Sequence, residues 1–215
     1  MSVNRSAQGA AQGLAQSSTP TRRVFFALWP NAQVCTQLQQ VSGDLHAKTG
    51  GRRMMADSLH LTLVFVGQVT NSQLEEMKKV ASVVRGQRFE VQFDQTGCWQ
   101  HNHIAYLGTR HPPSALLSLV RQIETGLDEA GIAYDSRQYK PHITLIRNAD
   151  CGALKGSALK GGAVQADASA TPSNPIFNPI HWQANDFVLL QSGFGQNRPA
   201  GAPYTELGRW PLSSD

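Results

Sequence analysis

Residues 140–147 read KPHITLIR and residues 59–65 read LHLTLVF, so a histidine and a threonine two positions apart recur in two apolar surroundings. The two histidines are 82 positions apart (142 − 60). Alternate side chains of a β-strand point to opposite faces. Each stretch therefore predicts a strand with one apolar face turned to a core, while its histidine and threonine share the other face.

The sequence around these two stretches predicts strands punctuated by helices. Apolar spacings of three and four residues favour helices over 31–48 and 70–85, and Pro112 and Pro113 open a third helix that stops near Gly131. Because hairpins also occur among the strands, we expect an α+β fold with mainly antiparallel sheet. Short apolar or alternating runs predict strands over 22–30, 58–67, 89–99, 103–108, 140–147, 185–192 and 204–212.

The chain has 215 residues, which suits one large domain or two small lobes. Residues 1–21 are small and polar without an apolar segment, so we expect a disordered N-terminal tail rather than a secretory signal. We expect residues 22–215 to form a single bilobal domain, with a long flexible loop at about 149–175 that is rich in glycine, alanine and serine. No run is long enough to span a membrane.

Composition adds a weak preference for an anionic partner. The net charge is +4, although only 16% of the residues are charged. The three cysteines are odd in number and widely spaced, so they suggest neither a zinc ribbon nor a disulfide framework. Reduced thiols in the cytoplasm fit this pattern. No glycine-rich phosphate loop of the Walker or dinucleotide type is present.

Two related halves would bring the polar strand faces together, and His60 and His142 would then suit acid–base catalysis. Imidazole titrates near pH 6.5, so one ring can be neutral while its partner is protonated. The hydroxyls of Thr62 and Thr144 could donate to phosphoryl oxygens beside them. A zinc site would need further ligands at suitable spacing, which the sequence lacks, so we expect no metal. One such motif is more often structural, but two in matching strands favour catalysis.

These motifs resemble the 2H phosphoesterase superfamily, and within it the RNA 2′,3′-cyclic phosphodiesterase family, also called 2′-5′ RNA ligases. The resemblance runs from about Arg22 to Leu212 and includes RVFFALWP, LHLTLVFVG, YKPHITLIR, FVLLQS and YTELGRWPL. It implies two pseudo-symmetric α+β lobes with outer helices and an active-site cleft between them. The implied activity is hydrolysis of a 2′,3′-cyclic phosphate to a 2′-phosphate, without a metal or other cofactor.

The resemblance implies a role for each motif residue. His60 would protonate the departing 3′ oxygen, His142 would activate water, and Thr62 and Thr144 would bind the phosphate oxygens. Arg147 matches the family's arginine five residues after the second histidine and is expected to bind phosphate as well. Simple strand alternation puts Arg147 on the face opposite to His142 unless the strand bulges there.

Two further residues are candidate RNA contacts. Arg53 lies in a basic, glycine-rich loop and could bind an RNA phosphate, although such a residue is more often simply solvated. Tyr139 precedes the second motif and could stack on a base or pack on the neighbouring hairpin.

The expected substrates are RNA ends or nucleotides that carry a 2′,3′-cyclic phosphate, and the expected enzyme is a cytoplasmic monomer with no membrane partner. Three alternatives stay open: ligation or cleavage of 2′-5′ linkages at the same site, a non-catalytic RNA-end binding module, and a purely structural domain. Binding alone does not need two titratable groups, which favours an enzyme. A bell-shaped pH–rate profile would separate a catalyst from a binder.

Overall fold

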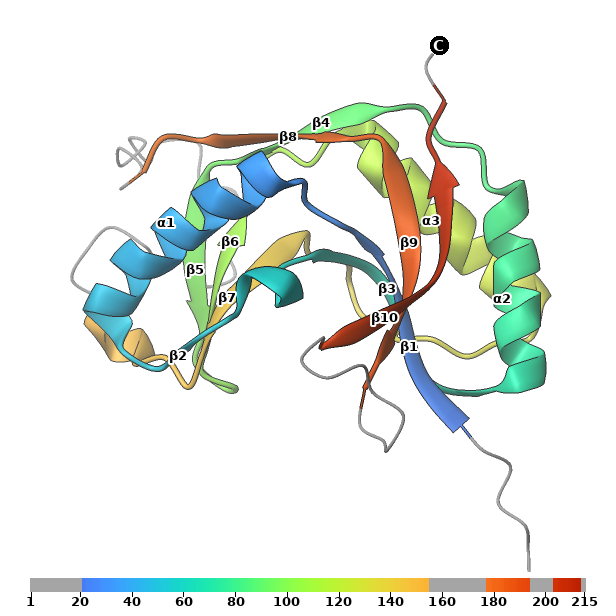
Figure 1. The fold of residues 1–215 in the computed structure, drawn as a ribbon, viewed down its shortest axis with the longest axis horizontal. Helices are drawn as coiled ribbons and strands as arrows, with labels where there is room; N and C mark the ends of the chain where they lie inside the picture. Colours follow the sequence, from blue (N-terminus) through green and yellow to red (C-terminus); the bar gives the residue numbers. More distant parts are fainter. Residues whose placement is uncertain (1–20, 155–176, 194–202, 214–215) are drawn as a thin grey trace, which may run out of the picture.

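The computed structural model describes residues 21–154, 177–193 and 203–213, whose arrangement Figure 1 shows. The expected tail, apart from Thr21, and the expected loop, apart from residues 149–154, lie outside these residues. The strands are β1 (Thr21–Leu28), β2 (Arg52–Arg53), β3 (Leu61–Thr70), β4 (Phe89–Phe93), β5 (Gln95–Trp99), β6 (Ile104–Gly108), β7 (His142–Arg147), β8 (Ile180–Ala184), β9 (Asp186–Ser192) and β10 (Tyr204–Pro211). The helices are α1 (Ala32–Thr49), α2 (Asn71–Val83) and α3 (Ser114–Glu129), with short 3-10 helices η1 (Ala56–Ser58) and η2 (Cys151–Leu154).

Most of the strands form one antiparallel sheet. The eight-stranded sheet has the order β10-β9-β1-β3-β7-β6-β5, and β2 also pairs with β7. Strands β4 and β8 form a separate antiparallel pair. Helix α1 lies beside the half of the sheet that contains β5, β6 and β7, whereas α2 and α3 lie beside the half that contains β1 and β3 (Figure 1). The α+β class with mainly antiparallel sheet is therefore confirmed.

The helices form where the apolar spacing predicts them. Helix α1 starts after Asn31, whose side chain accepts a hydrogen bond from the Val34 amide at 2.9 Å. Helix α2 starts after Thr70, which forms a reciprocal capping box with Gln73. No helix in the described part of the chain is long and apolar enough to cross a membrane.

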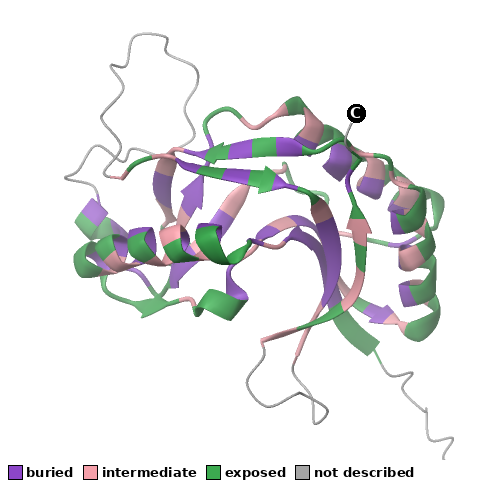
Figure 2. Ribbon diagram, turned by 45° about the horizontal axis from the view of Figure 1, so that its top comes forward, coloured by how far each residue is buried: buried purple, intermediate pink, exposed green. Residues whose placement is uncertain are grey.

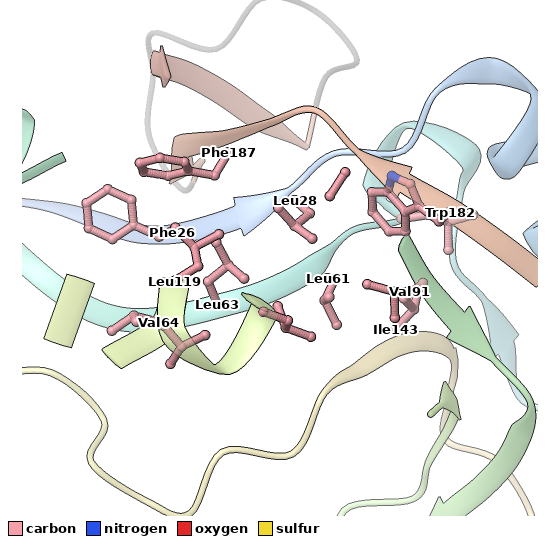
Figure 3. Close-up of a cluster of buried hydrophobic side chains, with 14 of the residues drawn as sticks. Phe26, Leu28, Leu61, Leu63, Val64, Val91, Leu119, Ile143, Trp182 and Phe187 are labelled. Carbon is pink, nitrogen blue, oxygen red and sulfur yellow. The ribbon is translucent and has the colours of Figure 1, made fainter. Parts of the chain in front are cut away.

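One large apolar core covers a single face of the sheet. Figure 3 shows Leu28 of β1, Leu61 of β3 and Ile143 of β7 within this core, which continues across both halves of the sheet. Figure 2 shows the same division, with buried residues on the strands and exposed residues on the outer sides of the helices. Because the core fixes which face of each strand turns inward, it also fixes which side chains face the other way.

A single residue pair joins the two halves of the sheet. Leu61 of β3 lies opposite Ile143 of β7 in antiparallel register, and we call these two residues the junction pair. Each directly follows a motif histidine, and each is fully buried. A local two-fold axis therefore passes through the junction pair and relates one motif to the other.

Three local features differ from the sequence expectation. The predicted strand 89–99 is divided at Asp94 into β4 and β5, which belong to different sheets, and the Asp94 carboxylate accepts a hydrogen bond from the Arg110 amide at 2.9 Å. Strand β4 then pairs with β8, which the sequence pattern did not predict. Residues 151–154, placed in the loop by the sequence, form η2.

The structure also corrects the expectation of three reduced cysteines. Cys98 of β5 and Cys151 of η2 form a disulfide, with their Cα atoms 5.5 Å apart, whereas Cys35 is a free thiol. The sequence gives no sign of this pairing because 53 positions separate the two residues. They meet only when β5, β6 and β7 have paired.

Candidate active site

The four motif side chains lie on the sheet face opposite to the main core. His60 directly precedes β3, and His142 is the first residue of β7. Continuing the register of the junction pair by one residue in each direction places His60 opposite Thr144 and Thr62 opposite His142. Side chains that lie directly opposite each other share a face of the sheet. The structure thus brings both histidines and both threonines together, each half supplying one of each.

Strand β7 carries a β-bulge just after its motif threonine. Thr144 lies opposite Tyr106 of β6, whereas Ile146 lies opposite Ala105, which leaves Leu145 as an extra residue. A bulge shifts the alternation of the following side chains by one position. Leu145 and Ile146 are therefore both fully buried although they are neighbours in the sequence.

This bulge brings Arg147 to the histidine face. Arg147 lies opposite Ile104, which shares a face of β6 with Tyr106, and Tyr106 in turn lies opposite the motif threonine of β7. The objection from simple alternation is thereby removed. Strand β3 has a matching irregularity at Leu63 in its pairing with β1, so the position equivalent to Arg147 in the first half is Phe65.

The backbone holds both histidines in the same tautomer. Nδ1 of His60 donates to the Ser58 carbonyl oxygen at 2.8 Å, and Nδ1 of His142 donates to the Lys140 carbonyl oxygen at 2.7 Å. A carbonyl oxygen can only accept, so the neutral ring carries its proton on Nδ1 in both cases. Nε2 of each ring is then the atom that can take up or deliver a proton. Both acceptors lie two residues before their histidine, in agreement with the local two-fold axis.

Three aromatic side chains surround His60. Its ring is parallel to that of Trp29, with an angle of 5° between the planes and 6.1 Å between the centroids. The rings of Phe25 and Tyr204 lie 4.9 and 5.1 Å from it. Trp29 and Tyr204 could not be assigned to the site from the sequence, because an aromatic residue in an apolar stretch is usually a core residue.

The surroundings of His142 come from β5 and β6. The rings of Trp99 and Tyr106 lie 4.5 and 5.9 Å from the imidazole. Gly97 lies opposite Tyr106, and a Cβ atom at position 97 would lie only 2.4 Å from the Tyr106 hydroxyl oxygen. The glycine therefore leaves the space that Tyr106 needs. Sequence reasoning also missed Trp99 and Tyr106.

Both imidazoles bind a proton less readily than a solvated histidine. Burial lowers the pKa of His60 from 6.5 to about 4; the charges of His142 and Arg147 lower it as well, and the hydrogen bond to Ser58 opposes them. Burial also lowers the pKa of His142, against the opposing effect of its hydrogen bond to Lys140. An anionic phosphate bound beside the rings would favour their protonated forms.

The two candidate RNA contacts make their interactions within the protein. The Tyr139 hydroxyl donates to the Thr62 carbonyl oxygen at 3.2 Å, and the ring packs against the main core. The Arg53 guanidinium donates to the Gln39 carbonyl oxygen at 2.7 Å and to the Ser42 hydroxyl at 3.2 Å, so it is held against α1. Tyr139 therefore contacts the backbone of the first motif while its ring packs against the main core.

Arg52, rather than Arg53, lies beside Arg147. Strand β2 pairs with β7 so that Arg52 is opposite Arg147, and both residues are exposed. Gly51 makes this approach feasible, because its φ is +83° and a Cβ there would lie 2.7 Å from the Arg147 carbonyl oxygen. Among the described residues, no group of three or more His, Cys, Asp or Glu side chains is arranged to hold a metal ion.

Comparisons with known proteins find relatives that are similar in sequence and in fold. The family model described as LigT like Phosphoesterase matches residues 28–106. The RNA 2′,3′-cyclic phosphodiesterase of Escherichia coli (strain K12) is 29% identical over 192 residues, which cover 89% of this chain and 97% of that protein. The protein of the same name from Archaeoglobus fulgidus is 23% identical over 188 residues, or 86% and 97% of the two chains. The crystal structure of E. coli LigT complexed with 3′-AMP superimposes with a TM-score of 0.71, at 29% identity, covering 91% of this chain and 100% of that one.

Proposed function

We propose that this chain, which matches the LigT-like phosphoesterases in sequence and in fold, hydrolyses 2′,3′-cyclic phosphates on RNA ends or nucleotides and leaves a 2′-phosphate. One observation carries the proposal. His60 and His142 lie on the same sheet face, and each donates Nδ1–H to a backbone carbonyl oxygen, which leaves both Nε2 atoms available for proton transfer. Two such groups are what the concerted opening of a cyclic phosphodiester needs.

The reaction needs one base and one acid. A water oxygen forms a bond to phosphorus as the bond between phosphorus and the 3′ oxygen breaks. One imidazole takes the water proton at Nε2, while the other imidazole, initially protonated, gives a proton to the departing 3′ oxygen. The products are a 2′-phosphate and a 3′-hydroxyl group, and proton exchange with water restores the starting state. No cofactor takes part.

Thr62, Thr144 and Arg147 are proposed to hold the phosphate. The threonine side chains lie directly opposite the histidines across the junction, so their hydroxyls can donate to oxygens of a phosphate placed between the rings. Arg147 adds a positive charge on the same face, since the bulge at Leu145 turns it there. A guanidinium is well suited to bind phosphate oxygens.

The proposed division of labour follows the family resemblance, with His60 as the acid and His142 as the base. In the free protein the low pKa of His60 makes it a poor proton carrier. The assignment therefore requires the negative charge of the substrate phosphate to raise the pKa of His60, so that the imidazole is protonated in the complex. A substrate with sulfur in place of the bridging 3′ oxygen tests this, because a thiolate leaves without being protonated. His60→Ala should regain most of its lost activity on the thio substrate, whereas His142→Ala should not.

The central experiment measures hydrolysis of a nucleoside 2′,3′-cyclic phosphate in the presence of EDTA and identifies the product isomer. We expect turnover to the 2′-phosphate and a loss of roughly 10²–10⁴-fold in His60→Ala and His142→Ala. His111→Ala is the matched control, because His111 is exposed and belongs to neither motif. If the folded wild-type protein does not turn over, or both variants keep full activity, the proposal is wrong.

Three further measurements define the reaction and the acting species. A bell-shaped pH–rate profile would distinguish catalysis from simple RNA-end binding, which should only weaken with salt. Product analysis with 2′-5′ linked RNA would show whether the same residues also cleave or join that linkage. We propose a monomer as the acting species, and light scattering of the purified chain at assay concentration tests this.

A further inference from the structure

The histidine face extends along β1 beyond the motif residues. Arg23, Phe25 and Ala27 alternate along the strand and share this face. Phe25 and Ala27 belong to a small apolar cluster that is separate from the main core, and Trp29, Phe65 and Tyr204 pack against it. We call this cluster and the three rings the aromatic surface. Because Phe25 and Tyr204 also touch the His60 ring, the aromatic surface begins at the reacting histidine.

Arg23 lies at the end of the aromatic surface farther from His60, and its side chain packs over the Phe65 ring. Its guanidinium carbon is 4.9 Å from the centroid of the Phe65 ring. Phe65 is the residue that the local two-fold axis relates to Arg147 (147 − 82). Each half of the sheet therefore presents a guanidinium on the histidine face, one from Arg147 itself and one from Arg23 stacked on Phe65.

Stacking on Phe65 leaves the N–H donors of the Arg23 guanidinium uncovered. One flat face of Arg23 rests on the ring, but the N–H donors of a guanidinium point outward in its plane. None of the described acidic residues forms a salt bridge with Arg23, although Arg137 and Arg209 both have such partners. Its neighbour Arg22 points to the other face and donates to Asn71 and Gln191 side chains at 3.1 and 2.9 Å.

Tyr204 connects the strand position of Arg23 with His60. Arg23 lies opposite Ser192 of β9, and Ser192 lies opposite Tyr204 of β10. Burial raises the pKa of Tyr204, and the charges of Arg147 and Arg23 oppose that effect. The Tyr204 ring also touches His60, so the cross-strand row from Arg23 through Ser192 ends beside that histidine.

We propose that Arg23 binds the phosphate on the 5′ side of the nucleoside whose 2′,3′-cyclic phosphate is opened. A nucleoside placed on the aromatic surface would have its cyclic phosphate at the histidines and its 5′ phosphate at Arg23. Aromatic rings and arginines are the usual contacts of single-stranded nucleic acid. The substrate class is then a 5′-phosphorylated nucleotide or an RNA end, rather than a nucleoside cyclic phosphate with a free 5′-hydroxyl. This inference rests on the proposed function and specifies its substrate.

Three substrates isolate the contact: adenosine 2′,3′-cyclic phosphate, its 5′-phosphorylated form, and the dinucleotide that ends in the same cyclic phosphate. In the wild-type protein the 5′-phosphorylated substrate should have a KM about tenfold below that of the nucleoside form, the effect expected of one exposed charge-assisted contact. Arg23→Gln should abolish this preference. For the 5′-phosphorylated substrate, the slope of log KM against the logarithm of the salt concentration should be smaller by about 0.7 in Arg23→Gln than in the wild-type protein. This is the change expected when one phosphate contact to a single strand is lost.

Arg22→Gln is the matched control, because it removes the same charge from the adjacent position on the opposite face. The wild-type preference should survive in this variant. Equal losses in the two variants would show a general effect of charge and overturn the proposal. A loss in Arg23→Gln that appears only with the dinucleotide would mean that the guanidinium meets the second base, which also overturns it.

A binding measurement separates this inference from the proposed function. Adenosine 2′,5′-bisphosphate and adenosine 2′-monophosphate are the expected products of the 5′-phosphorylated and the nucleoside substrate. Titration calorimetry should give about a tenfold lower Kd for the bisphosphate, and Arg23→Gln should remove that difference. If turnover is absent but this difference is found, the hydrolysis proposal fails and the Arg23 contact stands. If turnover is present but the two ligands bind equally, the opposite holds.

Discussion

The partly buried imidazole of His60 should make the stability of the protein depend on pH. Its pKa is about 4 in the folded protein and near 6.5 in a solvated histidine. Between these two values the unfolded chain binds a proton that the folded chain does not. Acidification through this window therefore favours unfolding, and stability falls from pH 6.5 down to about pH 4. Above pH 6.5 this histidine contributes no pH dependence.

The size of the effect follows from the same two values. The full difference corresponds to roughly 3 kcal/mol, of which about 2 kcal/mol is already lost at pH 5. The perturbation is His60→Asn, whose amide can still donate to the Ser58 carbonyl oxygen but does not titrate. Urea unfolding at pH 7.5 and pH 5 gives the free energy of unfolding of both proteins. His142 titrates in both, so its contribution cancels when the two differences are compared.

We expect the wild-type protein to lose about 2 kcal/mol more than His60→Asn between the two pH values. A control substitution, His111→Asn, removes an exposed imidazole and should reproduce the wild-type difference. Equal losses in the wild-type protein and His60→Asn would show that His60 is as easily protonated in the folded protein as in the unfolded chain. The burial argument, and with it the account of the site's protonation, would then be wrong.

Other parts of the site give three shorter predictions. Tyr139→Phe leaves the Thr62 carbonyl oxygen without its donor and should lower the free energy of unfolding by about 1 kcal/mol in urea denaturation; an unchanged midpoint would mean that the bond contributes nothing. Gly97→Ala places a Cβ 2.4 Å from the Tyr106 hydroxyl oxygen and should reduce kcat against the cyclic phosphate by roughly tenfold, while kcat equal to wild type would show that Tyr106 can move freely. Thiol titration of the denatured, unreduced chain should find one free thiol, that of Cys35, whereas three thiols would exclude the disulfide.

The alternation of side chains along two strands was sufficient to predict which residues of each motif face the core and which face away from it. Leu61 and Ile143 face the core, as the pattern required, and the motif histidines face away from it. Helix positions were also predictable, because the apolar spacing is regular and Thr70 is a strong cap for α2. These features depend on residues close together in the sequence, which is why a sequence pattern can reveal them.

The orientation of Arg147 and the disulfide could not be obtained in this way. A period of two residues puts Arg147 on the wrong face, and only the pairing with β6 shows that Leu145 is an extra residue. The only hint in the sequence was that two apolar residues, Leu145 and Ile146, are adjacent where strict alternation would place a polar one. Cys98 and Cys151 meet because three strands bring them together. Such features depend on pairing between distant segments, so local propensity carries no information about them.

The imperfect two-fold relation between the motifs bears on which oxygen leaves. A perfectly symmetric pair of imidazoles would leave the choice between the 2′ and 3′ oxygens of a cyclic phosphate to the substrate alone. Here Arg147 stands in one half where Phe65 stands in the other, and Trp29 with Tyr204 surrounds one ring while Trp99 with Tyr106 surrounds its partner. The departures from symmetry, rather than the shared motif, are what can make the ring opening regioselective.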